Sequence, residues 1–445
     1  MTTVVMGSRS PGRRWHTYRS PRRVRPLVGV LGAVVAFDQG IPSSHLPSAG
    51  DRLADTLLVT DPDPTTETTG EDRGGIGRTA GFKGASPNPV VMSELDSGHE
   101  YEVIVVGVGG MGSAATHHLA ARGVEVLGLE RYDVPHAMGS SHGVTRIIRK
   151  AYHEHPDYVP LLDRAYELWD DLDAQHDREL LHTHGSLALG RPDAETVTGA
   201  EEACRTHGLE YERLDAARID ERFPGFDLPD DFVGIYQPEG GFLWSEQCIV
   251  AQVDATHREG GTIHARERVT EWEATDESVR VVTDRDTYTA EKLVVAAGAW
   301  APKVLPEFAD VLRPQRQVLG WFQPTTPVDF LPESLPVYVV ERDEGDLYYG
   351  FPRFHVPGVK VGKHYHFRED VDPDEMAREP RDEDEAALRE WLAHGLPTAN
   401  GPPMALSTCL YTNTPDEEFV IDHHPTYDNV VVACGFSGHG FKFSS

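Results

Sequence analysis

Residues 103–130 constrain the fold more than any other part of the chain. Four consecutive apolar residues open this segment, as in a strand that is buried on both faces. A G-x-G-x-x-G sequence follows at once, formed by Gly107, Gly109 and Gly112. A helix-compatible stretch, a second apolar run and the acidic Glu130 complete the segment. This order predicts a strand–helix–strand unit and favours it over a glycine-rich turn in an unrelated α/β unit.

Each part of this unit has its own physical role in holding a dinucleotide. The first glycine permits a tight turn, the second lets the backbone approach a pyrophosphate, and the third lets the helix pack closely on the strand. The helix N-terminus offers free N–H groups to phosphate. Glu130 is placed to accept hydrogen bonds from a ribose hydroxyl. The segment therefore predicts dinucleotide binding, but it identifies neither the dinucleotide nor the chemistry.

The 445-residue chain is long enough for two or more domains and carries 72 acidic against 41 basic residues, a formal net charge of −31. Because the acids are spread along the sequence, we expect a surface adapted to high salt, typical of a halophilic source, rather than an ordinary acidic protein. No basic face can form outside the N-terminal arm, which argues against a nucleic-acid partner. Four irregularly spaced cysteines fit a reducing, cytoplasmic compartment. No apolar run approaches the ~20 residues that span a bilayer, so no membrane partner is expected.

Residues 1–98 differ in composition from the rest of the chain. Their beginning is rich in Arg, an apolar run follows at 26–37, and the remainder is rich in Thr, Pro, Asp and Gly without a period. Arg22 and Arg23 before the apolar run are compatible with a twin-arginine export signal, but no A-x-A cleavage site follows. We expect instead a disordered or spurious extension, with Met92 as the natural first residue.

The pattern after the dinucleotide unit alternates between helical and strand-like segments. A Gly/Ser turn at 139–143 precedes a helix that is predicted to open at 145–149 and to continue at 158–172. Further helices are predicted at 245–259 and 383–396, and strands at 269–272, 279–282, 292–297, 318–322, 347–351, 359–364 and 429–434. Because strand–helix units are interrupted by mixed segments, we predict an α/β fold in which a dinucleotide-binding domain is interleaved with a second sheet domain.

Two arginines of the predicted helix, Arg146 and Arg149, are spaced to share one face. Two guanidinium groups there would clamp a carboxylate or a phosphate. An arginine pair on a helix is ordinarily solvated surface. The flanking isoleucines and the preceding Gly/Ser loop make partial burial an equal alternative.

A predicted strand places Lys360, Gly362 and His364 on one side, and its neighbour places Tyr349 on the same side as Phe351. A Lys and a His with a Gly between them leave room for a ligand. Periodicity alone, however, favours a solvent-facing edge of an amphipathic strand.

Three further residue types near the end of the chain have chemical potential. Lys442 lies between two phenylalanines, so a half-buried ammonium in need of an anionic partner is plausible. Cys409 by itself is typical of a packed core thiol. His423 and His424 precede a proline in an Asp-rich loop, which predicts a surface turn; we predict no metal site.

Taken together, residues 101–445 resemble the monomeric sarcosine oxidase and N-methyltryptophan oxidase group of flavoenzymes. The most specific segments are GSSHGVTRIIR at 139–149, YYGFP at 348–352, VKVGKH at 359–364, CLYTNTPDEEFVID at 409–422 and GFSGHGFKFSS at 435–445. The resemblance implies a Rossmann-like FAD-binding domain with an interleaved mixed-sheet α+β substrate domain. The implied division is an extension at 1–98, FAD-binding parts at 99–180, 241–312 and 412–445, and substrate-domain parts at 181–240 and 313–411.

The resemblance also implies roles for individual residues. Those expected to bind the cofactor are Gly107, Gly109, Gly112, Glu130, His142, Arg146, Cys409, Gly438 and Lys442, with Cys409 forming a covalent thioether to the flavin. Those expected to bind the substrate are Arg149 and Lys442 at the carboxylate and Tyr349 and His364 at the amine. Lys360 is expected to activate oxygen, and the catalytic set comprises Lys360, His364, Tyr349 and Arg146.

The implied function is an FAD-dependent oxidase, and a monomer, that takes a secondary amino acid such as sarcosine or N-methyltryptophan and O2. Hydride transfer to flavin N5 would be followed by imine hydrolysis and formation of hydrogen peroxide. A dehydrogenase with an electron carrier is disfavoured by Lys360, and an NAD-dependent dehydrogenase by Cys409. A third alternative is an inactive, truncated flavoprotein, since the family continues into another helix after the position of Ser445. Close relatives often carry a second His at the position of Ser141, which puts the flavin chemistry in doubt.

Overall fold

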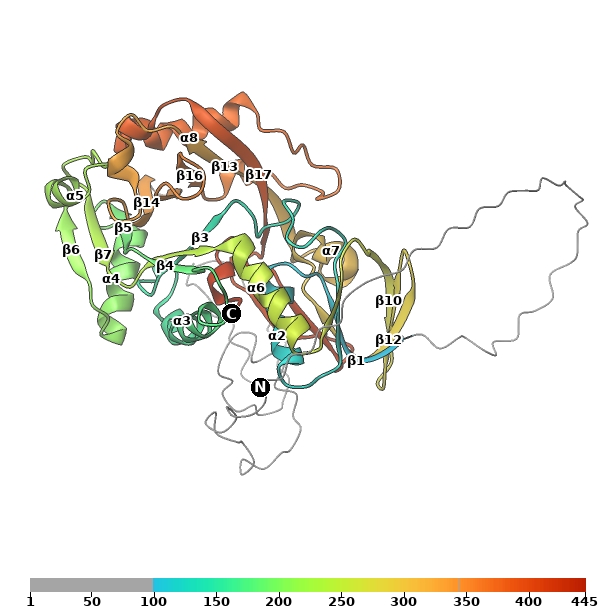
Figure 1. Ribbon diagram of the computed structural model, residues 1–445. Coiled ribbons are helices and arrows are strands. Elements are labelled where there is room, and N and C mark those ends of the chain that lie inside the picture. Colours follow the sequence, from blue (N-terminus) through green and yellow to red (C-terminus); the bar gives the residue numbers. More distant parts are fainter. Residues whose placement is uncertain (1–98, 344) are drawn as a thin grey trace, which may run out of the picture. The chain divides into compact units, whose positions relative to one another are not determined.

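A computed structural model describes residues 99–343 and 345–445, which belong to one compact unit (Figure 1). The expected extension at 1–98, with its arginine pair and Met92, lies outside the described residues. Within the described part of the chain, no helix is both long and apolar enough to cross a membrane. The predicted α/β fold is confirmed and comprises several sheets.

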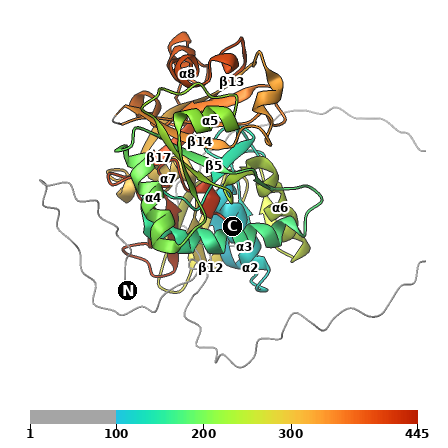
Figure 2. The same cartoon turned by 90° about the vertical axis from the view of Figure 1, so that its left-hand side faces the viewer.

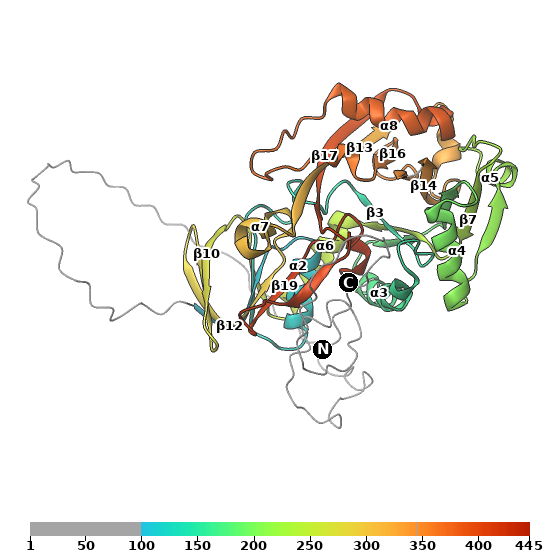
Figure 3. The same ribbon diagram turned by 180° about the vertical axis from the view of Figure 1, so that it is seen from behind.

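The first sheet is built on the predicted strand–helix–strand unit. Strand β1 (His99–Val106) pairs in parallel with β2 (Val126–Leu129), and α2 (Gly110–Ala120) connects them. The helix begins at Gly110, within the glycine turn itself. Strand β12 (Thr287–Val295) flanks β1 on its other side, and β19 (Val430–Cys434) continues the parallel pairing. Figure 3 shows β19 and β12 side by side in this sheet.

Shorter strands and two helices complete this part of the molecule. Its remaining elements are β9 (Thr262–His264), β10 (Val269–Ala274), β11 (Val279–Thr283), β18 (Val420–His423), α6 (Ser245–Arg258) and α7 (Ala301–Val304). Ile104 and Val105 point to opposite faces of β1 and are both fully buried, as expected for a strand covered on both sides.

The second sheet carries the segments that the sequence singled out for chemistry. Its strands, in spatial order, are β17 (Pro403–Asn413), β13 (Arg313–Phe322), β16 (Val359–Lys363), β15 (Asp346–Phe351), β14 (Val337–Asp343), β5 (Ser186–Gly190), β7 (Val233–Gln237) and β6 (Glu212–Asp215). The pairing of β14 with β5 is parallel, so the sheet is mixed. Because β16 lies between β13 and β15, the solvent-facing edge that periodicity favoured for it is wrong.

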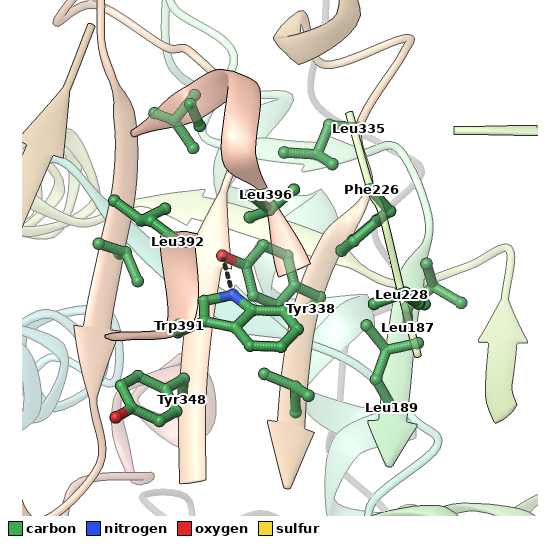
Figure 4. Packing of buried hydrophobic residues seen from close by; sticks show 14 of the residues in the cluster. Leu187, Leu189, Phe226, Leu228, Leu335, Tyr338, Tyr348, Trp391, Leu392 and Leu396 are labelled. Atoms are coloured by element: carbon green, nitrogen blue, oxygen red, sulfur yellow. Dashed lines mark hydrogen bonds between the residues drawn. The ribbon is translucent and has the colours of Figure 1, made fainter. Parts of the chain in front are cut away.

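Helix α8 (Asp382–Gly395) covers one face of the second sheet. Trp391 of this helix packs among buried leucines and donates a hydrogen bond to Tyr338 Oη at 3.0 Å (Figure 4). Helix α5 (Ala216–Arg222) packs on the same face at the β5–β7 end, whereas α4 (Glu195–His207) packs on the opposite face of these strands. This apolar packing fixes the strands whose other face is turned toward the candidate site.

A small third sheet joins β3 (Thr145–Ile148), β8 (Gly241–Trp244) and β4 (Leu181–Thr183). The helix predicted at 145–149 is therefore wrong, and Arg146 and Arg149 do not share a helix face. Thr145, Ile147 and Ile148 are β-branched residues that favour a strand when a partner is available, and β8 supplies one.

The remaining predicted helix is α3 (Val159–Asp173), which packs beside the end of the chain. Figure 2 shows the C-terminus next to α3, and Ser445 Oγ donates a hydrogen bond to Ala165 O at 3.1 Å. The short 3-10 turn Phe441–Phe443 precedes this contact and brings Lys442 into the interior.

Candidate active site

The glycine turn between β1 and α2 has the geometry that its sequence requires. Gly107 has a positive φ of 94°, and a Cβ atom there would lie 2.6 Å from Ala296 O. A Cβ atom at Gly112 would lie 1.7 Å from Gly107 O, so only glycine permits the close approach of α2 to the turn. At Gly109 a Cβ atom would meet nothing within 4 Å, which leaves the backbone open to a ligand.

The N-terminus of α2 and Glu130 complete an anion-binding and hydroxyl-binding edge. Gly109 has no side chain to cap the helix, and the first turn carries no acid. Gly110 N donates to Ser141 Oγ at 3.3 Å, and the backbone from Gly109 to Met111 lines a cavity. Glu130 is buried, and its two carboxylate oxygens accept hydrogen bonds from Val108 N and Tyr132 N, each at 2.9 Å. These bonds fix the carboxylate while each oxygen keeps a second lone pair for a ribose hydroxyl.

A cavity of about 710 Å³ extends from this edge, within the usual range of cofactor sites. Of the residues predicted to hold the cofactor, those lining it are Gly107, Gly109, Glu130, Arg146 and Gly438. His142 is buried just beyond the lining, and its Nε2 has no partner among the described residues. An open glycine, an uncapped helix end, a fixed carboxylate and an orphaned ring nitrogen together fit an elongated dinucleotide such as FAD.

Cys409 lies on β17 where the second sheet approaches the Gly/Ser loop. Its Sγ is 3.7 Å from both Arg146 Nη2 and Ser140 O, and the residue is 3% exposed. Burial alone would raise the pKa of this thiol, but His142 and Arg146 outweigh it and lower the pKa to about 7. A thiol with this pKa is partly ionised at neutral pH, which makes Cys409 more reactive than an ordinary core thiol.

Lys360 is buried, and no carboxylate of residues 99–343 or 345–445 pairs with its amine. Its Nζ donates to Gly143 O and Thr145 O at 2.7 Å and to Thr145 Oγ1 at 3.0 Å. The Phe351 ring lies 4.3 Å below it. Burial, reinforced by the nearby Arg146 guanidinium, lowers the pKa of Lys360 well below its usual value.

Arg149 and Lys442 converge on Tyr152. The Arg149 guanidinium and the Lys442 ammonium lie 4.8 and 5.1 Å from its ring centroid. Arg149 Nη2 donates to both oxygens of Glu154, at 3.0 and 3.1 Å, and Lys442 Nζ donates to His439 O at 2.6 Å. The two cations thus share one buried region that already holds a carboxylate.

The sequence analysis did not single out Glu154. Its position five residues after Arg149 is the one feature of the sequence that could have suggested it as a partner of that arginine. Burial alone would raise the pKa of its carboxyl, but Arg149, His153, His439 and Lys442 hold it well below its usual range. Burial first, and then repulsion by Arg149, lowers the pKa of Lys442 to about 7 despite the attraction of Glu154. The region is therefore a cluster of mutually coupled titratable groups, which is typical of active sites.

Tyr349 and His364 meet at Tyr411, a second residue that the sequence did not single out. Tyr411 Oη lies 3.3 Å from His364 Nδ1 and is hydrogen bonded to Tyr349. Burial lowers the pKa of His364 to about 3. The room expected beside Gly362 is not free, because a Cβ atom there would lie 2.3 Å from the Tyr349 ring.

The His423–His424 pair differs from the predicted surface turn: His423 is exposed but ends strand β18. His424 is buried, pairs with Glu307, and stacks on Tyr427 with ring centroids 5.2 Å apart. Among residues 99–343 and 345–445, no group of three or more His, Cys, Asp or Glu could hold a metal ion.

The interleaved sheets, the glycine turn and the cavity define a dinucleotide-binding protein. The chain belongs to the FAD-dependent oxidoreductase family, whose model matches residues 102–445. It is 44% identical over 349 residues to monomeric sarcosine oxidase of Streptomyces avermitilis, covering 77% of this chain and 90% of that protein. It is 35% identical over 349 residues to N-methyl-L-tryptophan oxidase of Yersinia pseudotuberculosis, covering 78% of this chain and 92% of that protein.

Solved structures agree with this family. NikD, described as an unusual amino acid oxidase essential for nikkomycin biosynthesis, superposes in its open form with a TM-score of 0.68 at 29% identity. The match covers 78% of this chain and 91% of NikD. L-proline dehydrogenase from P. horikoshii shares the fold with a TM-score of 0.67 at 21% identity, covering 78% of this chain and 91% of that one.

Proposed function

We propose that the protein is an FAD-dependent oxidase of secondary, N-methyl amino acids such as sarcosine or N-methyltryptophan. The observation that carries this proposal is the buried pair of cations, Arg149 and Lys442, with the Glu154 carboxylate bound beside them. A substrate carboxylate has the same charge and geometry as Glu154. The names of the relatives, oxidases of sarcosine and of N-methyl-L-tryptophan, support the substrate class.

The proposed binding of FAD follows from the cavity. Gly107, Gly109, Gly112 and Glu130 would hold its ADP half, and His142, Arg146 and Gly438 would surround the flavin. When bound, FAD accepts a hydride from the carbon next to the amine nitrogen and passes the electrons on to dioxygen, which yields hydrogen peroxide. The oxidised substrate is an imine, which water hydrolyses to an aldehyde or keto acid and an amine.

The residues of the chain would bind and orient the substrate. Arg149 and Lys442 would fix its carboxylate, which holds the amine end against one position and removes the entropic cost of finding it. The same positive charges disfavour the ammonium form of the amine, and only the neutral amine can lose a hydride readily. His364, Tyr349 and Tyr411 would line the amine end, where His364 is neutral at physiological pH.

Lys360 and Cys409 have separate proposed roles toward the cofactor. Lys360, with its lowered pKa and hydrogen bonds to neutral acceptors only, would aid electron transfer to dioxygen by offering a positive charge or a proton to the developing anion. Cys409, whose thiol has a pKa of about 7, would hold the flavin through a thioether. The new C–S bond would replace the thiol proton and one C–H hydrogen of a flavin methyl group, and the two electrons set free would pass through the flavin to dioxygen.

The setting of the enzyme is part of the proposal. We propose a cytoplasmic monomer adapted to high salt, supported by the monomeric relatives and by the acidic composition. We also propose that residues 99–180, 241–312 and 412–445 form the FAD-binding domain and that 181–240 and 313–411 form the substrate domain. The separate sheets of β1 and β13 support this division.

The proposal is tested with the purified full chain and its bound flavin. Anaerobic addition of sarcosine or N-methyl-L-tryptophan is expected to bleach the flavin absorbance, and admission of air should restore it with one peroxide per substrate. Bleaching without recovery in air would assign a dehydrogenase instead. Failure of every secondary amino acid to bleach the flavin would refute the substrate class.

Covalent attachment has its own test. After acid precipitation, the yellow colour is expected to remain in the protein pellet and to move to the supernatant in Cys409→Ser. Cys434→Ser is the matched control, because Cys434 is also a buried thiol but lies at the end of β19 in the first sheet. Burial raises the pKa of the Cys434 thiol to about 12. Flavin that stays in the supernatant of the unmodified protein would refute the covalent bond.

A further inference from the structure

The loop after β16 has an unusual backbone for its residue types. Tyr365, Phe367 and Arg368 have φ values of 52°, 54° and 49°, in the left-handed region that favours glycine. None of the three is glycine, Asn or Asp. Such conformations persist only where the surroundings hold them, and they gather at functional sites. This loop follows His364 directly, so the strain lies at the edge of the candidate site.

A clamp from a second loop holds this strained segment. The Arg368 guanidinium lies 4.5 Å from the Tyr365 ring centroid, and its Nη1 donates to Glu417 Oε1 at 3.3 Å. Glu417 also accepts a hydrogen bond from the Tyr365 hydroxyl, and its own φ is positive at 62°. The Glu417 carbonyl accepts a hydrogen bond from His439 Nε2 at 3.0 Å. Both loops are thus tied to each other and to the segment that carries Lys442.

The clamped ring of Tyr365 forms a wall of the cluster around Glu154. Its centroid lies 3.9 Å from that of His364 and 6.1 Å from that of Tyr411, with the Tyr411 ring nearly perpendicular. Glu154 contributes to the raised pKa of Tyr365, as expected for a group within its field. The ring therefore packs directly against His364, the residue proposed to line the amine end of the substrate.

We propose that Tyr365, held by Arg368 and Glu417, is a specificity-determining residue that restricts the site to amino acids with a small side chain, such as sarcosine. This inference rests on the proposed function and names the substrate class within it. It predicts which of two relatives, named for sarcosine and for the larger N-methyl-L-tryptophan, this protein resembles in its choice of substrate.

The role of Tyr365 is steric and not chemical. Burial, together with the Glu417 carboxylate, raises the pKa of Tyr365 well above its usual value, so the hydroxyl stays neutral. Its proton is committed to Glu417. What remains available to a substrate is the ring itself, whose position depends on the clamp.

The experiment measures kcat/KM for sarcosine and for N-methyl-L-tryptophan on the flavin-loaded enzyme. The unmodified enzyme is expected to prefer sarcosine. Tyr365→Ser should shift the ratio at least tenfold toward N-methyl-L-tryptophan. Tyr365→Phe, which keeps the ring but loses the hydrogen bond to Glu417, should shift it in the same direction by a smaller factor. Arg368→Gln, at an exposed position, frees the ring without removing it and should shift the ratio in the same direction by a smaller factor.

Phe367→Ser provides the matched control. Phe367 has the same left-handed backbone in the same loop, but 49% of it is exposed and it contacts His366 instead of the cluster. Its substitution should leave the substrate ratio unchanged. Flavin content and melting temperature are recorded for each variant, and Arg368→Gln keeps the test decisive if Tyr365→Ser does not fold.

The outcomes separate the two proposals. Unchanged ratios in both Tyr365→Ser and Arg368→Gln, or a preference of the unmodified enzyme for N-methyl-L-tryptophan, overturn the size restriction and leave the oxidase function standing. Equal shifts in Phe367→Ser also overturn it, because the loop and not the ring would then set the ratio. Absence of flavin bleaching by either substrate overturns the proposed function itself.

Discussion

At the scale of single residues, the site is organised around charges that lack an ordinary partner. Lys360 donates only to neutral oxygens, and Lys442 donates to a carbonyl while Glu154 is bound by Arg149. Burial makes each isolated charge costly, which is why the pKa values of both lysines fall. An anionic ligand would relieve this cost, so binding and protonation are coupled.

Because Glu154 accepts two hydrogen bonds from Arg149, we expect it to compete with a substrate carboxylate for this arginine. In Glu154→Gln the competing charge is lost, so the Kd of acetate, measured by its perturbation of the flavin spectrum, should fall about threefold to tenfold. Loss of a charge-assisted hydrogen bond to a buried arginine should also lower the free energy of unfolding by about 1–3 kcal/mol. Saturating acetate should restore much of the melting temperature. A weaker affinity for acetate would show that Glu154 supports the clamp and does not compete with it.

Lys442 should make ligand binding depend on pH. Its pKa is lowered to about 7, so the ammonium is present below that pH and is lost as the pH rises through it. The Kd of acetate should therefore increase above pH 7, by at most about tenfold per pH unit. In Lys442→Met the affinity should be weaker and flat across this range. A Kd that falls with rising pH would contradict the assignment.

At the scale of elements, the segment between β16 and α8 is hydrogen bonded to the first sheet and its connections beside the cofactor cavity. Asp374 lines the cavity and accepts hydrogen bonds from Arg131 Nη1 at 2.6 Å, Trp300 Nε1 at 2.9 Å and Lys303 Nζ at 2.6 Å. Partial burial opposes ionisation, but these three donors hold the pKa of Asp374 well below its usual range. All three donors come from the nucleotide-binding sheet and its connections.

Loosening this segment should speed the loss of non-covalent flavin. In a Cys409→Ser background, Asp374→Asn should increase the rate of FAD release about tenfold, because two ion pairs at the rim weaken. Asp372→Asn is the matched control: Asp372 lies two residues away and pairs with Lys303 at 2.6 Å, but it does not line the cavity. Release is followed by flavin fluorescence. Equal rates in the two variants would exclude a special role for Asp374.

Several elements could be predicted from the sequence, and the failures have a common physical cause. The turn at Gly107 depends on residues close together in the chain, so the spacing of its glycines was enough to predict it. The segment at 145–149 became a strand because β8, about a hundred residues away, pairs with it. Lys360 is buried because β13 and β15 flank its strand. Glu154, Tyr411 and Asp374 matter through partners that only the folded chain brings together.

At the scale of the whole molecule, the charge of −31 predicts a dependence on salt. Raising KCl from 0.1 to 1 M shortens the screening length from about 10 to about 3 Å, which weakens repulsion between the acids. The melting temperature should therefore rise with KCl over this range. Potassium glutamate at equal ionic strength serves as the comparison for ion-specific effects. A melting temperature that falls with salt would argue against a halophilic adaptation.

The position of Cys409 has a mechanical consequence. The thiol belongs to the second sheet, whereas the glycine turn at Gly107 belongs to the first. A cofactor bonded to Cys409 and bound by the glycine turn, as proposed, would act as a cross-link between segments about three hundred residues apart in the chain. Closing so long a loop lowers the entropy of the unfolded state, as a disulfide does. The prosthetic group would then be a tether that makes the two sheets lose their structure together.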